Sequence, residues 1–220
     1  MHLNDLPERS QEYLKALWDL VEHHGETVTV KDLVARTGQK PPTASEAIKR
    51  LAAQGLVEHE RYAGVSLTAA GRELAMEIVR RHRLLETFLV TNLGYSWDEV
   101  HEDADILEHA CSDRFIDRLD ALLGHPDRDP HGDPIPDAHG RIADLGTDTL
   151  ADAPVGQPLT LLRVCDTNSD LLRYLGQHGV QPGDELTIRA DVAGLLEIDV
   201  RGDVISLAKA AAHDVTVAPA

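Results

Sequence analysis

The hydrophobic pattern of the chain changes once, and this change limits the possible folds. Up to about residue 124 the apolar residues recur at helical spacing, whereas from about residue 157 they occur in short runs typical of strands. Residues 125–140 lie between them, and their sequence, HPDRDPHGDPIPDAHG, is rich in Pro, Gly and Asp, which predicts a linker or structured loop. We therefore predict a mainly helical protein with a separate β module at its C-terminal end.

The N-terminal segments are spaced like a winged helix-turn-helix. Residues 7–24 predict a first helix, and VKDLVART followed by Gly38 predicts a second, short one. KPPTASEAIKRLAAQG predicts a third helix, opened by prolines and closed by Gly55. LVEHE and VSLT then predict a small hairpin. Three helices followed by a two-stranded wing are the arrangement of a winged helix-turn-helix DNA-binding domain.

Further helices and strands complete the predicted architecture. Helices are expected from Thr68 onward, after the capping-box sequence SWDE, and over SDRFIDRLDALLG. Their wide apolar faces suit a dimer interface, with an ordinary intrachain core as the alternative. LTLLRV, ELTIRA, LLEIDV, VISLA and DVTV predict a small barrel-like module. The predicted domains are a DNA-binding domain (1–72), a helical domain (73–140), a linker (141–156) and a β domain (157–220).

The negative charge is unevenly distributed. The formal net charge is −17, but residues 1–72 hold 9 Lys and Arg against 10 Asp and Glu, which leaves 12 against 28 for residues 73–220. Residues 31–72 have a local excess of positive charge, 7 against 4. A mildly basic segment beside an acidic body suits nucleic acid and cations as partners. Two cysteines and no apolar run of about 20 residues predict a cytoplasmic protein with no membrane partner.

Histidines and carboxylates recur on two helical segments in a way that predicts a metal centre. At about 100° per residue, His101, Asp105, Glu108 and His109 fall within about a 100° arc of one helix. On the preceding helix, His82 and Glu86 are spaced i, i+4. Two antiparallel helices could present these side chains as a two-site metal centre, although a solvated acidic face is the alternative.

Enzyme motifs are absent from the sequence. It contains no HExxH, CxxC, GxSxG or glycine-rich phosphate loop. We therefore expect neither an enzyme nor a small-molecule substrate, and a dimetal hydrolase is the less favoured alternative.

Four blocks of sequence resemble the diphtheria toxin repressor family of metal-dependent transcriptional repressors. They are PPTASEAIKRLAAQGLVEHE, SLTAAGRELAMEIVRRHRLLETFL, WDEVHEDADILEHACSD and DPHGDPIP, within residues 8–137. The resemblance implies a winged helix-turn-helix, a helical dimerisation domain and a C-terminal SH3-like β-barrel domain, the last matched more weakly. It also implies a homodimer that binds double-stranded promoter DNA.

The family pattern implies two metal sites per subunit. An ancillary site would use His82, Glu86 and His101, completed by side chains from the SH3-like domain, for which Asp166 is the first candidate and Asp170 the second. Asp170 could instead cap the helix that follows it.

The implied primary site would use Glu12, Asp105, Glu108 and His109. Iron-sensing members have Cys or Met at position 105 and Met at position 12, where this chain has carboxylates. Hard oxygen ligands suit Mn²⁺, so we favour the manganese-responsive branch, with Fe²⁺ as the alternative metal. The segments VRRHRLLETFLV and LGYSWDEVHEDADILEH also resemble that branch.

These inferences combine into a predicted mechanism. Without metal, the converging carboxylates of the primary site would repel one another and leave the first helix mobile. A bound cation would tie this helix to the dimerisation helices and fix the spacing of two recognition helices on a palindromic promoter. A metal-independent winged-helix regulator, which would bind DNA equally well after chelation, is the alternative.

The predicted recognition helix spans about residues 42–54. Side chains near its N-terminal half would reach base edges, and basic side chains and the wing would contact the DNA backbone. The predicted DNA-contacting residues are Lys40, Pro42, Thr43, Ser45, Glu46, Lys49, Arg50, Arg61 and Tyr62.

Overall fold

The structure, a computed structural model, describes residues 2–24, 28–60 and 64–220. It divides into two compact units. The first comprises residues 1–82, 108–110 and 136–141, and the second comprises residues 83–107, 111–135 and 142–220. The division falls within two helices, so each unit is described by itself. No helix among the described residues has the length and hydrophobicity needed to cross a membrane.

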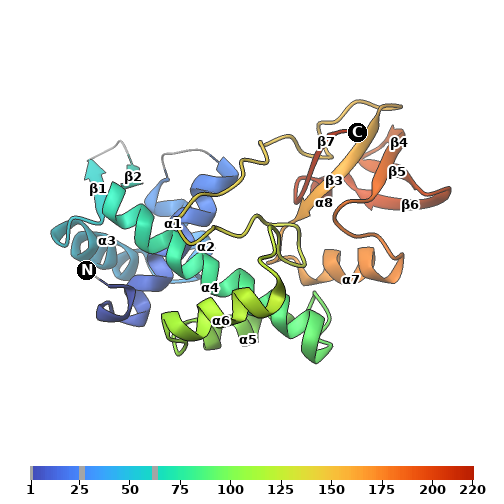
Figure 1. Cartoon of the computed structure of the whole chain (residues 1–220). Coiled ribbons are helices and arrows are strands. Elements are labelled where there is room, and N and C mark those ends of the chain that lie inside the picture. The colour runs from blue at the N-terminus through green and yellow to red at the C-terminus, as the bar shows by residue number, and fades with distance from the viewer. Residues whose placement is uncertain (1, 25–27, 61–63) are drawn as a thin grey trace. The chain divides into compact units, whose positions relative to one another are not determined.

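The first unit contains the predicted winged helix-turn-helix (Figure 1). Strands β1 and β2 form an antiparallel hairpin in which Val57 pairs with Leu67 and Glu60 with Gly64. The predicted ends of the first and third helices differ from the observed ends by one residue or less. The elements in chain order are η1 (Leu3–Asp5), α1 (Glu8–His24), α2 (Val30–Thr37), α3 (Pro41–Ala53), β1 (Val57–Glu60) and β2 (Gly64–Leu67).

Local sequence explains where α2 and α3 begin and end. Thr29 and Asp32 form a reciprocal capping box at the start of α2, and Gly38 ends it in the left-handed conformation, with φ of 63°. Prolines occupy the first two positions of α3, where a missing N–H costs no helical hydrogen bond. The inward faces of these helices meet in a core that includes Leu14, Leu17, Leu33, Ala44, Ile48, Leu51 and Val65.

Three helices follow the hairpin: α4 (Ala69–Leu93), α5 (Val100–Glu108) and α6 (Asp113–Leu123). The prediction that SWDE opens a helix was wrong in its boundary. Glu99 accepts a hydrogen bond from the Ser96 N–H at 3.0 Å, but the pair closes a turn and the helix begins at Val100.

The apolar faces of these helices are divided between core and surface. Within the second unit one part forms a core of Leu84, Leu85, Leu89, Val100, Ala104, Ile116, Leu119 and Ile135. Another part stays exposed, namely Ile106, Leu107, Phe115 and Leu122. The intrachain core therefore accounts for only some of the apolar surface, and the exposed remainder is available to a second subunit.

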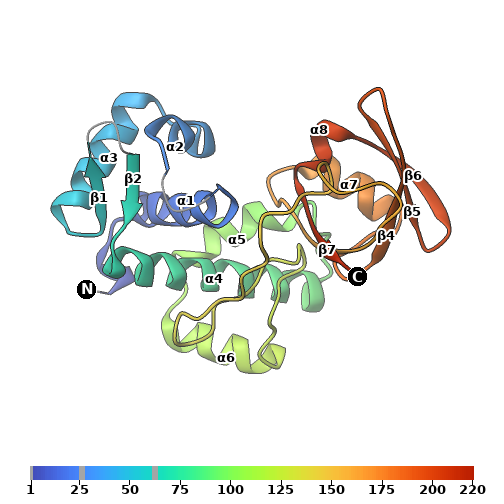
Figure 2. The same ribbon diagram turned by 90° about the horizontal axis from the view of Figure 1, so that it is seen from above.

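The C-terminal part of the second unit is an antiparallel sheet with strand order β6-β5-β4-β3-β7. Helix α7 (Ser169–Gln177) packs against one face of the sheet in both Figure 1 and Figure 2, and its leucines belong to the same core as the strands. The predicted β module is confirmed. Its strands and last helix are β3 (Pro158–Val164), β4 (Glu185–Val192), β5 (Leu195–Val200), β6 (Asp203–Ala208), α8 (Lys209–Ala212) and β7 (Val215–Pro219).

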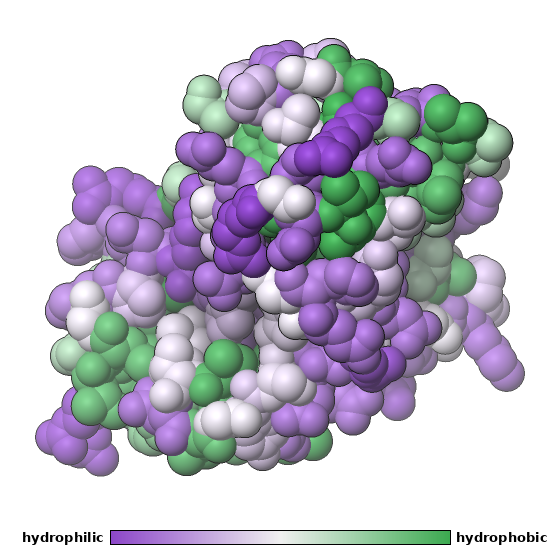
Figure 3. Space-filling view, turned by 90° about the vertical axis from the view of Figure 1, so that its right-hand side faces the viewer, coloured by the Kyte–Doolittle hydropathy of each residue, from purple (hydrophilic) through white to green (hydrophobic). Residues whose placement is uncertain are grey.

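The surface is mixed rather than uniformly apolar. On the face drawn in Figure 3, apolar residues form separate patches among more numerous hydrophilic ones. This distribution agrees with the high content of charged residues.

Candidate metal centre and DNA interface

In the first unit, α1 brings a carboxylate to the segment that ends α5. We call Glu12, Glu108 and His109 the first cluster. His109 Nε2 lies 2.5 Å from Glu12 Oε1 and 3.6 Å from Glu108 Oε1. The Glu108 side chain is fully buried, whereas Glu12 is 46% exposed. The sequence therefore predicted three side chains that do converge, including Glu12, which came from the resemblance alone.

Gln11 fixes which nitrogen of His109 faces the carboxylates. The Gln11 amide NH₂ donates to the carbonyl oxygens of Leu3 and Leu6, at 3.2 and 2.9 Å. Its Oε1 is therefore turned toward His109 Nδ1, 2.9 Å away, and Nδ1 must carry the hydrogen of that bond. In the neutral ring this leaves the Nε2 lone pair facing Glu12 and Glu108, as a metal ligand requires.

A buried lysine that the sequence reasoning did not anticipate lies beside the first cluster. Lys15 Nζ donates to both carboxylate oxygens of Glu108, at 3.1 and 2.9 Å, and lies 2.9 Å from His82 Nδ1. His82 Nδ1 is itself 2.6 Å from Glu108 Oε2. The predicted mechanism, which assumed uncompensated carboxylates, is therefore incomplete, because the Lys15 ammonium group already pairs with Glu108.

The pKa of His109 follows from these neighbours. The hydrogen bond with Glu12 raises the pKa above its ordinary value, partial burial opposes the shift, and the charges of Glu108 and Glu12 reinforce it. Lys15 lowers it. A cation bound at Nε2 therefore competes with a proton.

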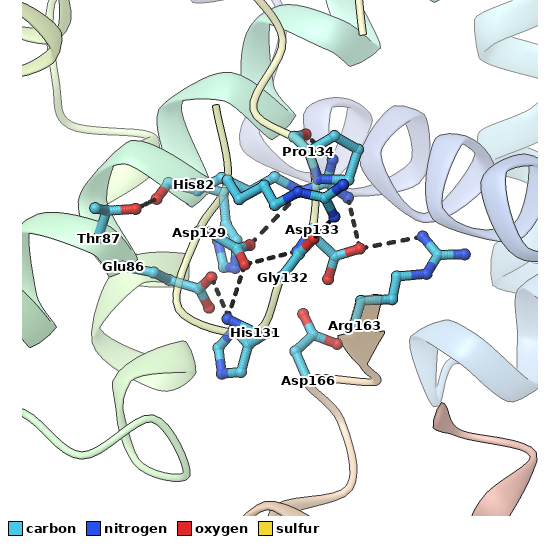
Figure 4. A network of polar contacts seen from close by, with 12 residues as sticks. His82, Glu86, Thr87, Asp129, His131, Gly132, Asp133, Pro134, Arg163 and Asp166 are labelled. Atoms are coloured by element: carbon cyan, nitrogen blue, oxygen red, sulfur yellow. Dashed lines mark hydrogen bonds and ion pairs between the residues drawn. The ribbon is translucent and has the colours of Figure 1, made fainter. Parts of the chain in front are cut away.

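A second cluster lies wholly within the second unit and consists of Glu86, His101, Asp129, His131 and Asp166. His101 Nδ1 is 3.3 Å from Glu86 Oε1 and 3.3 Å from Asp166 Oδ2. His131 Nδ1 is 3.3 Å from Glu86 Oε2. Figure 4 shows Glu86 and His131 facing each other, with Asp129 and Asp166 nearby. Helices α4 and α5, the loop before the sheet and the turn after β3 thus contribute ligand types to one place.

The loop around His131 is held in a fixed shape. Asp129 Oδ1 accepts hydrogen bonds from the backbone N–H groups of His131 and Asp133, at 2.8 and 2.9 Å. His131 Nε2 donates to the carbonyl oxygen of Trp97 at 2.7 Å, and the Trp97 ring stacks near the imidazole. Since a carbonyl can only accept, Nε2 carries hydrogen, and in the neutral ring the Nδ1 lone pair faces Glu86.

The buried carboxylates of the second cluster raise the pKa values of His131 and Asp129. Burial lowers the pKa of His131, but the hydrogen-bonding and charge effects of Glu86, with the charges of Asp129 and Asp166, outweigh it and raise the pKa to about 10. Burial raises the pKa of Asp129 well above its ordinary value, and the charges of Asp133 and Glu86 add to this. A proton on His131 therefore supplies positive charge that a divalent metal could supply instead.

The donor sets of both clusters fit a divalent metal. Each cluster offers carboxylate oxygens and imidazole nitrogens, with ligand-type atoms close enough to share one ion. Neither cluster contains a thiolate. In each one, hydrogen bonds to the far side of an imidazole turn its other nitrogen toward the carboxylates, which is the usual second-shell arrangement around a metal-ligating histidine.

The predicted DNA-reading residues lie on and just before α3. Lys40, Pro42, Glu46, Lys49 and Arg50 are exposed. Thr43 and Ser45 are half-buried near the N-terminal end of the helix. The opposite face of α3 is buried through Ala44, Ala47, Ile48 and Leu51. The two predicted wing contacts, Arg61 and Tyr62, lie outside the described residues.

Comparisons with known proteins match each part of the chain to a described family. Residues 5–65 match "Iron dependent repressor, N-terminal DNA binding domain" and residues 68–137 match "Iron dependent repressor, metal binding and dimerisation domain". Residues 149–219 match the FeoA domain. The chain is 31% identical to the iron-dependent repressor IdeR of Mycobacterium leprae (strain TN), over 98% of this chain and 99% of that protein. The chain belongs to the diphtheria toxin repressor family.

The names of relatives of the diphtheria toxin repressor family include both iron and manganese. A diphtheria toxin repressor of Corynebacterium efficiens is 29% identical over 98% of this chain and 97% of its own length. A solved structure described as a manganese-dependent transcriptional repressor in complex with manganese is 42% identical, with a TM-score of 0.90 over 96% of this chain and 100% of that one. The family consists of metal-dependent DNA-binding repressors, not enzymes, with a dimerisation domain.

Of the two ligand candidates that the family resemblance suggested in the C-terminal domain, one lies in a cluster and the other does not. Asp166 lies in the second cluster, but Asp170 does not: its side chain is 97% exposed and pairs with Arg173. Nor does Asp170 cap α7, because Asn168 accepts the hydrogen bond from the Leu171 N–H. In the second unit Asp105 Oδ2 lies 3.5 Å from His101 Nε2.

Two other predicted ligands, His82 and Asp105, stand on α4 and α5, the helices within which the division into units falls. His82 contacts Glu108 in the first unit and precedes Glu86 by one turn of α4. Its assignment to the ancillary site, like that of Asp105 to the primary site, stays a prediction.

Sequence reasoning missed four residues: Gln11 and Lys15, which contact the first cluster, and Asp129 and His131, which belong to the second. Gln11 and Lys15 are polar side chains on the buried side of α1, and this could have been noticed once Glu12 was considered a ligand. Asp129 and His131 stand in DPHGDPIP, which was quoted for the resemblance but interpreted only as part of a linker or structured loop. An aspartate and a histidine two residues apart, the histidine between Pro130 and Gly132, were the available signal.

Proposed function

We propose that this repressor is manganese-dependent and binds palindromic promoter DNA as a homodimer when Mn²⁺ occupies two sites per subunit, thereby controlling metal-ion homeostasis in the cytoplasm. Glu12, Asp105, Glu108 and His109 would form the primary site. His82, Glu86, His101 and Asp166 would form the ancillary site, with Asp129 and His131 added to it.

The observation that carries the choice of metal is the oxygen-rich first cluster. Glu12 and Glu108 converge on His109 without a sulfur ligand. Hard carboxylate oxygens suit Mn²⁺, whereas later and softer metals gain more from thiolate or thioether ligands. The 42% identity to a repressor solved with manganese supports the same choice.

The contacts of α1 indicate how metal binding would affect the DNA-binding surface. Glu12 projects from α1, whose buried leucines Leu14 and Leu17 belong to the winged helix-turn-helix core. A cation shared by Glu12, Glu108 and His109 supplies the positive charge that holds these groups together. Glu12 thereby ties α1 to the segment that ends α5, and α3 is carried with it. Such coupling is typically worth about 1–3 kcal/mol.

The direct test is metal-dependent DNA binding by the full-length protein. Promoter fragments are first selected from genomic DNA with Mn²⁺-loaded protein, and affinity for the best fragment is then measured by fluorescence anisotropy with Mn²⁺, Fe²⁺ or a chelator. Tight binding with Mn²⁺ that the chelator abolishes is the expected result. Equal affinity with the chelator would contradict metal dependence, and stronger activation by Fe²⁺ at matched free concentration would favour the iron-dependent alternative.

The metal preference can be tested with the double variant Asp105→Cys with Glu12→Met. Replacement of hard oxygen by sulfur should shift activation toward Fe²⁺ and later metals. If the ranking of metals did not change, the primary-site assignment would lose its support.

A further inference from the structure

The side chain of Lys15 occupies a place among ligand-type groups that is unusual for a lysine. Its nitrogen is within hydrogen-bond distance of both Glu108 oxygens and of His82 Nδ1. The Lys15 and Glu108 side chains are 9% and 0% exposed. Lysine is rarely buried to this extent unless it is paired. Here the pairing partner is a residue that a metal would also need.

A buried carboxylate needs a positive partner whether or not metal is present. Removing one member of a buried ion pair leaves the other member desolvated and unpaired, which is strongly destabilising. In this structure Lys15 supplies the positive partner of Glu108. A metal held by Glu108 would also supply positive charge to this carboxylate, so the two cations would compete for it.

We propose that Lys15 is an internal competitor of the metal that sets the concentration at which the repressor is activated. This inference rests on the proposed function, because it assigns Glu108 to the metal site. Metal binding then includes the cost of breaking two charge-assisted hydrogen bonds from Lys15 to Glu108. The protein responds only when free metal is high enough to offset that cost.

The position of Lys15 on α1 links this competition to the DNA-binding unit. Glu12 and Lys15 are three residues apart and lie on the same side of α1. In this structure α1 is held through Lys15 to Glu108 and through Glu12 to His109. A metal that took Glu108 from Lys15 would remove the first contact and leave Glu12 to hold α1. Activation would thus reduce two contacts about one turn apart to the one at Glu12, which would shift the helix rather than free it.

The test compares Lys15→Met with the unaltered protein. Methionine retains much of the length and apolar volume of the side chain but removes the charge. Mn²⁺ affinity is measured by the EPR signal of free Mn²⁺, and thermal unfolding is followed with and without Mn²⁺. Hydrogen bonds to charged groups are worth enough that Mn²⁺ should bind about 10- to 100-fold more tightly to the variant. The metal-free variant should also unfold at a lower temperature than the unaltered protein, and Mn²⁺ should raise its unfolding temperature more.

Two control variants separate the local effect from net charge and from packing. Lys209→Met removes the same charge from an exposed pair with Asp191 and should leave Mn²⁺ affinity unchanged. Lys15→Arg keeps a cation beside Glu108 and should bind Mn²⁺ less tightly than Lys15→Met. Circular dichroism checks that each variant folds, and Lys15→Gln replaces Lys15→Met if the latter does not.

The outcomes distinguish this inference from the proposed function. Unchanged or weaker Mn²⁺ binding by Lys15→Met, with normal manganese-dependent DNA binding by the unaltered protein, would overturn the role of Lys15 alone. Failure of the unaltered protein to bind Mn²⁺ would overturn the proposed function, and the inference with it. Tighter binding by Lys15→Met but not by Lys209→Met supports the competition.

Discussion

A single methyl group added at Gly132 should displace the loop that carries His131 of the second cluster. The φ of Gly132, +91°, lies in the region that favours glycine, and a Cβ would stand 2.1 Å from the carbonyl oxygen of Leu162. Real Cβ atoms essentially never approach below 3.0 Å, so the loop or β3 would have to move by about 1 Å. The neighbouring residue in this loop is His131, whose carbonyl oxygen accepts a hydrogen bond from the Val164 N–H at 2.9 Å.

The size of the effect can be worked out against a matched control. Gly146→Ala introduces the same methyl group at φ +69° with no atom within 4 Å, so it costs only the backbone strain, about 1–2 kcal/mol. Gly132→Ala adds the overpacking cost of about 1–3 kcal/mol, toward the upper end because the obstacle is backbone. We therefore expect Gly132→Ala to lower the free energy of unfolding by about 3 kcal/mol more than the control. For a chain of this size that difference lowers Tm by about a further 6–12 °C.

Calorimetry of both variants, with and without Mn²⁺, measures this difference. Because displacement of His131 removes a ligand type from Glu86, Mn²⁺ should also stabilise Gly132→Ala less than it stabilises Gly146→Ala. If the two variants unfolded at the same temperature and gained equally from Mn²⁺, the close packing of this loop on β3 would not matter for the site, and the reasoning would fail.

Three further predictions follow from the two clusters. Asp166→Asn should weaken binding of the second metal, whereas Asp170→Asn, on a side chain 97% exposed, should not; equal losses in a Mn²⁺ stoichiometry measurement would contradict the assignment. Gln11→Met removes the acceptor that fixes the His109 tautomer and should weaken Mn²⁺ binding by about 10-fold or more, whereas unchanged affinity in an EPR titration would disprove its positioning role. The raised pKa of His131, about 10 against an ordinary 6.5, means that its protonated form stabilises the metal-free fold fully below pH 6.5, and this contribution is lost as pH rises toward 10. Because metal must displace that proton, Mn²⁺ binding should tighten with pH over this range and release a proton at pH 7, and calorimetry in two buffers that found no release would refute this.

The helical parts of the fold could be predicted because their signals are local. Proline at the start of α3, glycine after α2 and α6, and the Thr29 cap each act within one or two turns, so a single sequence specifies them. The start of α5 was predicted too early because Ser96 and Glu99 make the hydrogen bond of a capping box in a turn.

The local pattern predicted the candidate site only where its ligands follow helical spacing, whereas Glu12 and Asp166 came from the family resemblance. His101, Asp105, Glu108 and His109 follow helical spacing, and so do His82 and Glu86. Lys15 and His131 join their clusters from other segments, 93 residues before Glu108 and 45 residues after Glu86 respectively. No local pattern specifies such contacts, because they depend on how α1 and the loop at residues 129–133 pack.

The pairing of this loop with β3 has a consequence for the order in which the protein is assembled. The backbone N–H of Val164 donates to the carbonyl oxygen of His131, and β3 is paired on one side with β7, a strand much later in the sequence. During synthesis from the N-terminus, the DNA-binding helices emerge long before β7. The loop that positions His131 beside Glu86 therefore packs on a strand whose pairing is completed only when β7 has been made. A nascent chain could fold its DNA-reading helices early, but β3 would gain this partner, and the loop its full support, only after β7 has emerged.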